Sequence, residues 1–223
     1  DADTADGAVM RYTTDGSTPT PSSGIVYSGP ISITKTTTIR AAAFRNGYLP
    51  TNVDTETYIF LDDAIHQSAS NTNTGVAPPA WPSTWSPNTT DYGMDPDVVN
   101  SPIYGATIKN DLQTIPTLSI VTGLNNLFGS TGLYSNPSGT GIAWERPASL
   151  ELINPDGSEG FQIDAGLRLR GGYSRSTSNP KHGLRILLRD TYGGTELHYP
   201  LFKSMDGTDA TRGRDRHFCS RFG

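Results

Sequence analysis

Two runs of alternating residues, joined by a polar turn region, constrain the fold of this chain more than any other feature. In the segment FQIDAGLRLR (161–170) leucines alternate with arginines, and KHGLRILLR (181–189) continues the alternation. A period of two is typical of half-buried β-strands. The glycines at 171–172 and the SNP sequence at 178–180 supply turn residues between the runs. The pattern therefore predicts a β-hairpin with a long loop, one apolar face and one basic face.

The basic face of this hairpin is the first candidate for a ligand-binding surface. By the alternation, Arg168, Arg170 and Arg185 share this face, and Lys181 enters the second strand. Guanidinium and ammonium groups are the usual partners of phosphate in proteins. Two interpretations stay open: these side chains contact a phosphate-containing ligand, or they form the solvated face of a sheet.

The composition favours short strands and many turns over long helices. The 223 residues include 24 glycines and 16 prolines, and the formal net charge is −5. This charge argues against general nucleic-acid binding, and no apolar run is long enough to span a bilayer. The single cysteine cannot form an intrachain disulfide. We therefore expect a mainly β protein, with no nucleic-acid partner and no membrane span.

The first part of the chain alternates between short strands and turns. Strands are expected at 9–14, 24–27, 31–33, 36–44 and 55–60, with the turn DGSTPT at 15–20. Several short strands with turn signals between them favour a small immunoglobulin-like β-sandwich. We assign residues 1–60 to this module.

Two segments of this module, RYTTDGSTPT (11–20) and VYSGPISITKTTTIRAAAF (26–44), carry a family resemblance. They resemble the β-sandwich module first known from the C-terminal part of chitobiases and β-hexosaminidases. The resemblance implies an accessory module without catalysis, either a spacer or a carbohydrate-binding unit. In relatives another strand usually precedes this segment, so we expect an open sheet edge here and self-association through open edges.

Residues 61–114 form a Pro- and Trp-rich linker, with a helical turn expected at 61–67 and a mobile stretch at 68–74. Its tryptophans are expected to pack on a neighbouring domain. Asp91, Asp95 and Asp97 place three carboxylates close together in the linker. Carboxylate oxygens are calcium ligands, but aspartates also cap helices and turns. Both interpretations stay open, and the first predicts a calcium cofactor.

A second resemblance covers residues 115–204. The order PTLSIV, WERPASLELI, GFQIDAGLRLRGGYSR, NPKHGLRILLR and YPLF is similar to the N-terminal part of the CotH kinase family. It implies a secreted or cell-surface protein with a partial kinase-like lobe, in which Lys181 contacts nucleotide phosphates. In that family the catalytic aspartates lie C-terminal of YPLF, whereas the tail 205–223 departs from the pattern. We expect that tail to be disordered and a working kinase to be absent.

Common catalytic motifs are missing from the sequence. It contains no G-x-S-x-G and no Walker A motif, and its four histidines occur singly. We therefore expect a structural or ligand-binding fragment of a multidomain protein, with carbohydrate or a phosphate-containing compound as ligand. The alternative is a metal-assisted hydrolase, using calcium or zinc, on a small-molecule or carbohydrate substrate.

Overall fold

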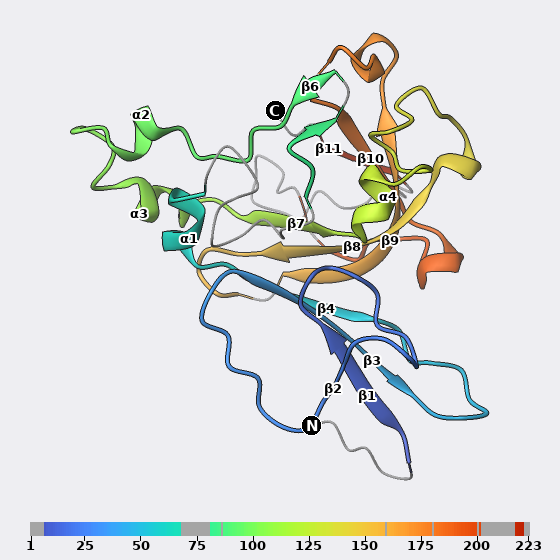
Figure 1. Ribbon diagram of the computed structural model, residues 1–223. Helices are drawn as coiled ribbons and strands as arrows, with labels where there is room; N and C mark the ends of the chain where they lie inside the picture. Colours follow the sequence, from blue (N-terminus) through green and yellow to red (C-terminus); the bar gives the residue numbers. More distant parts are fainter. Residues whose placement is uncertain are drawn as a thin grey trace.

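The computed structural model describes residues 7–67, 81–85, 87–158, 160–179, 181–199, 201 and 217–220, with residues 85 and 217–220 described by their backbone alone. The described chain is mainly β, which confirms the predicted fold class. It forms a four-stranded, a five-stranded and a two-stranded sheet. The two larger sheets are stacked as layers, and a small hairpin and a short helix lie on the far side of the larger sheet (Figure 1).

The four-stranded sheet is built from the first sixty residues. Its strands are β1 (Val9–Thr13), β2 (Ile25–Val26), β3 (Thr37–Phe44) and β4 (Asp54–Tyr58), in the order β2-β1-β3-β4. Four of the five predicted strands are therefore confirmed. Residues 31–34 are not a strand; their exposure alternates along the chain, which explains the misleading pattern, but they make no ladder pairing.

The turn at residues 15–20 closes around a buried arginine. The Ser17 amide donates a hydrogen bond to Asp15 Oδ1 (3.0 Å), and Gly16 has a φ of 77°, in the left-handed region that favours glycine. Arg40 of β3 is 6% exposed and donates to the Gly16 carbonyl (3.2 Å) and the Thr18 hydroxyl (2.9 Å). The turn motif therefore supplies the hydrogen-bond acceptors that a buried guanidinium needs.

The five-stranded sheet contains the predicted hairpin. Its strands are β7 (Thr117–Val121), β8 (Arg146–Ile153), β9 (Phe161–Arg170), β10 (Gly183–Leu187) and β11 (His217–Ser220), in the order β11-β10-β9-β8-β7. Strands β9 and β10 pair antiparallel, with Leu167 opposite Ile186 and Arg168 opposite Arg185. Strand β11 belongs to the tail that was predicted to be disordered, and it pairs with the edge of β10. The rest of the tail and the predicted mobile stretch 68–74 lie outside the described residues.

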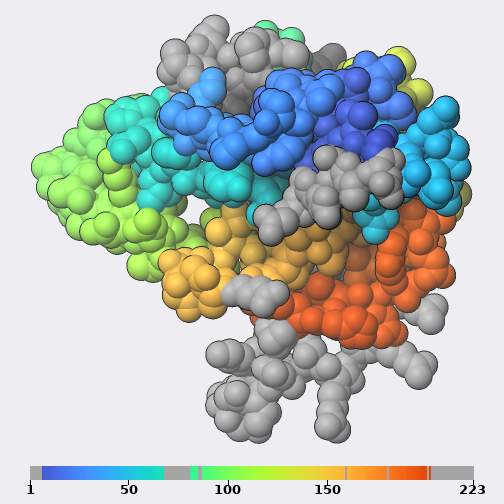
Figure 2. All heavy atoms as spheres, turned by 90° about the horizontal axis from the view of Figure 1, so that it is seen from below, coloured from blue at the N-terminus to red at the C-terminus, as the bar shows by residue number. Residues whose placement is uncertain are grey.

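Short elements connect and cover the two sheets. They are α1 (Leu61–Ile65), β5 (Thr84–Trp85), β6 (Asn88–Thr89), α2 (Pro96–Val99), α3 (Ile108–Leu112), α4 (Leu124–Phe128) and the 3-10 turns η1 (Ile142–Trp144), η2 (Tyr173–Arg175) and η3 (Asp190–Tyr192). The segment with α2 and α3 projects as a lobe at one end of the molecule, green in Figures 1 and 2. In the described part of the chain, no helix is long and apolar enough to cross a membrane.

The two faces of the five-stranded sheet differ in polarity. One face carries the hydrophobic core, in which Leu150, Leu167 and Ile186 are at most 2% exposed. The other face packs on the four-stranded sheet through polar contacts: the Thr57 amide donates to Glu151 Oε2 (2.8 Å), and the hydroxyl groups of Thr57 and Ser119 are 2.8 Å apart. Figure 2 shows the first unit, blue to cyan, directly against the gold and orange residues of this sheet. The layer opposite the four-stranded sheet is thus supplied by the second unit.

Candidate functional site

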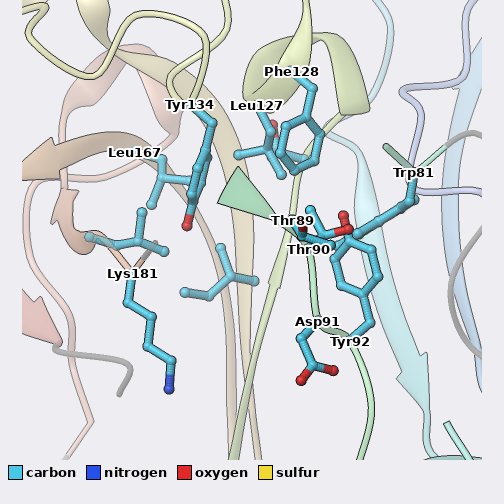
Figure 3. Close-up of a pocket in the computed structure, with 13 residues that line it drawn as sticks. Trp81, Thr89, Thr90, Asp91, Tyr92, Leu127, Phe128, Tyr134, Leu167 and Lys181 are labelled. Carbon is cyan, nitrogen blue, oxygen red and sulfur yellow. The ribbon is translucent and has the colours of Figure 1, made fainter. Parts of the chain in front are cut away.

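A cleft of about 340 Å³ opens on the apolar face of the five-stranded sheet (Figure 3). Its described lining comes from three parts of the chain: the segment around the β5–β6 hairpin, helix α4 with the loop that follows it, and strands β7, β9 and β10. The floor is apolar, because Leu167 and Leu184 project from the core face of the hairpin. A cleft of this size is at the lower end of the range for small-molecule sites.

Aromatic side chains form one wall of the cleft. The Trp81 ring meets Tyr92 edge-on, with centroids 5.1 Å apart, and meets Phe128 at 6.0 Å. Phe128 in turn lies 5.5 Å from Tyr134. Edge-to-face contacts at these distances are favourable for aromatic pairs. Trp81 of the linker therefore packs on the second unit, as the sequence predicted, whereas the Trp85 side chain lies outside the described residues.

Hydrogen bonds hold the linker segment of this wall in place. The Thr90 and Tyr92 hydroxyls both donate to the Pro82 carbonyl, at 3.0 and 2.7 Å. The Asn88 amide donates to the Thr177 carbonyl (2.8 Å) in the loop between β9 and β10. This bond ties the linker to the predicted hairpin, so the cleft wall is fixed at both ends.

The two tyrosines of the wall carry neutral hydroxyl groups. Burial raises the pKa of Tyr134, and the nearby Tyr92 hydroxyl adds to the rise. Burial also raises the pKa of Tyr92, against a smaller opposing effect of its contact with Thr90. Because an ordinary tyrosine already titrates near pH 10, both hydroxyls stay protonated at neutral pH.

Two opposite charges lie at the mouth of the cleft. Figure 3 shows the Lys181 ammonium and the Asp91 carboxylate on opposite sides of the same end. Lys181 is exposed, and Asp91 Oδ1 accepts a hydrogen bond from the Gly93 amide (2.9 Å). A ligand seated on the aromatic wall would meet a cationic donor on one side and an anionic acceptor on the other.

The arginines of the predicted basic face lie elsewhere. Side chains alternate along a strand, so Arg168 and Arg185 project to the face opposite the cleft. Arg170, at the end of β9, is exposed. The structure therefore places Arg168 and Arg185 on the face of the sheet opposite Lys181. Phosphate binding by any one of these residues remains a prediction.

A buried glutamate, which the sequence analysis missed, engages Arg168. The Glu145 side chain is 2% exposed and lies 2.5 Å from Arg168 Nη2 and 2.9 Å from Arg189 Nε. Burial by itself raises the pKa of Glu145, but hydrogen bonds from the two arginines and from Tyr192 outweigh it, so the pKa lies below its usual range. A Cβ on Gly166 would lie 2.5 Å from Glu145 Oε1, so this glycine leaves room for the carboxylate. Arg168 is therefore already ion-paired within the fold, with 18% of its side chain exposed.

Two of the three aspartates proposed as calcium ligands make local hydrogen bonds within their own turn or helix cap. Asp95 caps α2 by accepting a hydrogen bond from the Asp97 amide (2.9 Å), and Asp91 accepts from Gly93 within its own turn. In the residues that the structure describes, no group of three or more His, Cys, Asp or Glu side chains is placed to hold a metal ion. The capping interpretation accounts for two of the three residues, and calcium binding remains a prediction.

Comparison with known families supports the first of the two resemblances. Residues 2–55 match the family model described as the chitobiase/beta-hexosaminidase C-terminal domain. The matched segment runs from before β1 to the start of β4. The chain matches no curated protein and no solved structure, and similarity of residues 115–204 to the CotH kinase family stays a prediction. The first unit is thus similar to a carbohydrate-related structural module.

Proposed function

We propose that this chain is a non-catalytic module of a secreted or cell-surface multidomain protein, and that its aromatic cleft binds carbohydrate. The observation that supports this proposal most directly is the wall formed by Trp81, Tyr92 and Phe128. The C–H face of a pyranose ring is apolar, so it packs on aromatic rings, while its hydroxyls need polar partners at the rim. Asp91 and Lys181 offer an acceptor and a donor at that rim.

The family match gives independent support for the carbohydrate ligand. The matched module takes its name from enzymes of carbohydrate metabolism, and it packs directly on the sheet that carries the cleft. The contacts between the two sheets, from Thr57 to Glu151 and Ser119, give this module a structural role. It supports the sheet on the face opposite the cleft.

A second candidate ligand is a nucleotide or another phosphate-containing compound. It is favoured by the position of Lys181 at the mouth of the cleft and by the similarity of residues 115–204 to the CotH kinase family. A lysine neutralises phosphate charge, and an aromatic wall can stack a base. The alternative of a metal-assisted hydrolase has no comparable support among the described residues.

Thermal unfolding in the presence of ligands tests these candidates together. A ligand that binds the folded state alone raises the midpoint as its concentration exceeds the dissociation constant. We expect chito-oligosaccharide to raise it, and we expect Trp81→Ala to weaken binding at least about tenfold, which corresponds to about 1.4 kcal/mol. Thr89 is an exposed residue of the cleft lining. Thr89→Trp should therefore fill part of the cleft and weaken saccharide binding without removing a core contact.

The control is Tyr48→Ala, because Tyr48 is an aromatic residue that is 66% exposed on the first unit and outside the cleft. If saccharide no longer raises the unfolding midpoint of Tyr48→Ala but still raises those of Trp81→Ala and Thr89→Trp, the binding site lies on the first unit. A midpoint raised by ATP–magnesium alone, and lost in Lys181→Ala, would favour the second candidate. Wells with calcium and with EDTA test the metal prediction.

A further inference from the structure

A second pocket, of about 350 Å³, adjoins the cleft at the edge of the five-stranded sheet. It lies between β7 on one side and the ends of β3, β4 and the 14–16 turn on the other. The two pockets share four lining residues: Trp81, Ile120, Thr122 and Leu127. Because these residues line both, the two pockets are adjacent, and the Trp81 side chain is common to them.

Among the described lining residues, the second pocket carries more hydroxyl side chains than the cleft. Seven threonines and Ser119 belong to its described lining, and most of the other described lining residues are apolar. Considering the described residues, the hydroxyls of Thr14, Thr38 and Thr117 have no hydrogen-bond partner. A hydroxyl both donates and accepts, so these groups suit a ligand that is itself rich in hydroxyls.

Among the described residues that line this second pocket, only Asp15 is charged. The Asp15 carboxylate is already held by the Ser17 amide (3.0 Å) and hydroxyl (2.6 Å). Those bonds lower the pKa of Asp15, the Ser17 side-chain bond most strongly. An ionised and internally bonded carboxylate disfavours an anionic ligand here, so the lining suits an uncharged one.

We infer that the ligand is a linear, uncharged oligosaccharide that lies across Trp81, with one end in the aromatic cleft and the other in the hydroxyl-lined pocket. This inference rests on the proposed carbohydrate binding and specifies its substrate class. Each pocket alone is near the small end of the ligand-site range of about 300–1,000 Å³. A short saccharide occupies the aromatic cleft alone, whereas a longer chain reaches both pockets, and contacts made by one tethered ligand at two subsites raise its affinity.

The test is a calorimetric titration of the full chain with chito- and cello-oligosaccharides of two to six units. We expect the six-unit chain to bind at least about tenfold more tightly than the two-unit chain. Thr117→Tyr places a large side chain in the second pocket, at an exposed strand position where tyrosine is well tolerated. This variant should bind the two-unit sugar as the wild type does and lose the gain with length.

The matched control is Thr114→Tyr, at an exposed position outside both pockets, which should keep the full gain with length. A length effect that came only from the larger number of binding registers of a longer sugar would persist in Thr117→Tyr. Persistence of the length effect in Thr117→Tyr, or equal affinity for all lengths in the wild type, would overturn binding across the two pockets while leaving carbohydrate binding in the cleft intact. Absence of binding by every sugar would overturn both.

Discussion

The two faces of the five-stranded sheet use charged side chains in opposite ways. On the face toward the first unit, Glu145 is almost fully buried between Arg168 and Arg189. On the cleft face, Lys181 and Asp91 lie at the mouth, each reaching toward solvent. On the first face the Glu145 carboxylate is ion-paired within the fold, while the two charges on the second face lie where a ligand would arrive.

This difference teaches that a basic stripe in a strand does not by itself identify a binding surface. A basic side chain on a strand is available to a ligand only where no acidic residue from a distant segment forms an ion pair with it. Buried ions are costly unless they are paired, and removing one member of a buried pair leaves the other uncompensated. Exposed ions contribute little to stability. The two faces should therefore respond to mutation in opposite ways: one in stability, the other in binding.

The largest effect is expected for Glu145→Gln on the first face. The amide keeps the volume but leaves Arg168 and Arg189 without a counter-ion, and we expect a loss of about 3 kcal/mol in the free energy of unfolding at neutral pH. The Glu145 pKa is lowered in the folded state, so its contribution is complete above the ordinary value of 4.5 and is lost as the pH falls through the folded value. Urea unfolding of the variant and the wild type at several pH values measures both the loss of stability and its pH dependence.

Asp62→Asn is the control for this variant, since Asp62 forms an exposed ion pair with Lys109. We expect no measurable change in stability there. If Glu145→Gln has the same free energy of unfolding as the wild type, the ion pairs of Glu145 do not stabilise this face. The comparison between the two faces then fails.

The local part of the fold was predictable, and the pairing of charges was not. The hairpin at 161–189 follows from a period of two, a property of neighbouring residues. Glu145 is far from Arg189 in sequence, and no spacing rule connects the WERP segment to either arginine. The cleft was missed for the same reason, because its wall combines a linker tryptophan with residues 127–134.

The contact between the two units escaped prediction for a different reason. Thr55 and Ser149 are each 1% exposed, yet their polarity marks them in the sequence as solvent-facing. The interface is a polar seam in which Arg40 and Asp164 attract each other, and hydrophobic patterns carry no signal for such a surface. The sequence predicted two units, and the structure stacks their sheets along this polar seam.

A smaller effect, of opposite pH dependence, is expected for Glu151→Gln in this seam. Burial raises the Glu151 pKa, against a lowering by its hydrogen bond from Thr57. The folded state then holds the Glu151 proton more tightly than the unfolded chain. The contribution of Glu151 to stability is therefore greatest below the ordinary value of 4.5 and falls as the pH rises through the folded value. A glutamine does not titrate, and its carbonyl can still accept from the Thr57 amide.

The stability of Glu151→Gln relative to wild type should therefore improve as the pH rises, while that of Glu145→Gln should worsen. Unfolding free energies of the two variants and the wild type, measured side by side from about pH 3 to pH 7, give the sign of each pH dependence directly. Parallel curves for the two glutamates would contradict the claim that one is neutralised by arginines and the other penalised by burial.

The smallest effect on stability is expected for Lys181→Gln on the cleft face, within about 0.5 kcal/mol of the wild type because Lys181 is exposed. Its effect on binding separates the two candidate ligands. Glutamine still donates a hydrogen bond to a sugar hydroxyl, so binding of an uncharged saccharide should be nearly retained, whereas a phosphate ligand loses the positive charge it needs. Titration of the variant with both ligands measures this directly. A loss of stability comparable to that of Glu145→Gln would show that Lys181 also belongs to the charges that hold the fold, and the contrast between the two faces would not stand.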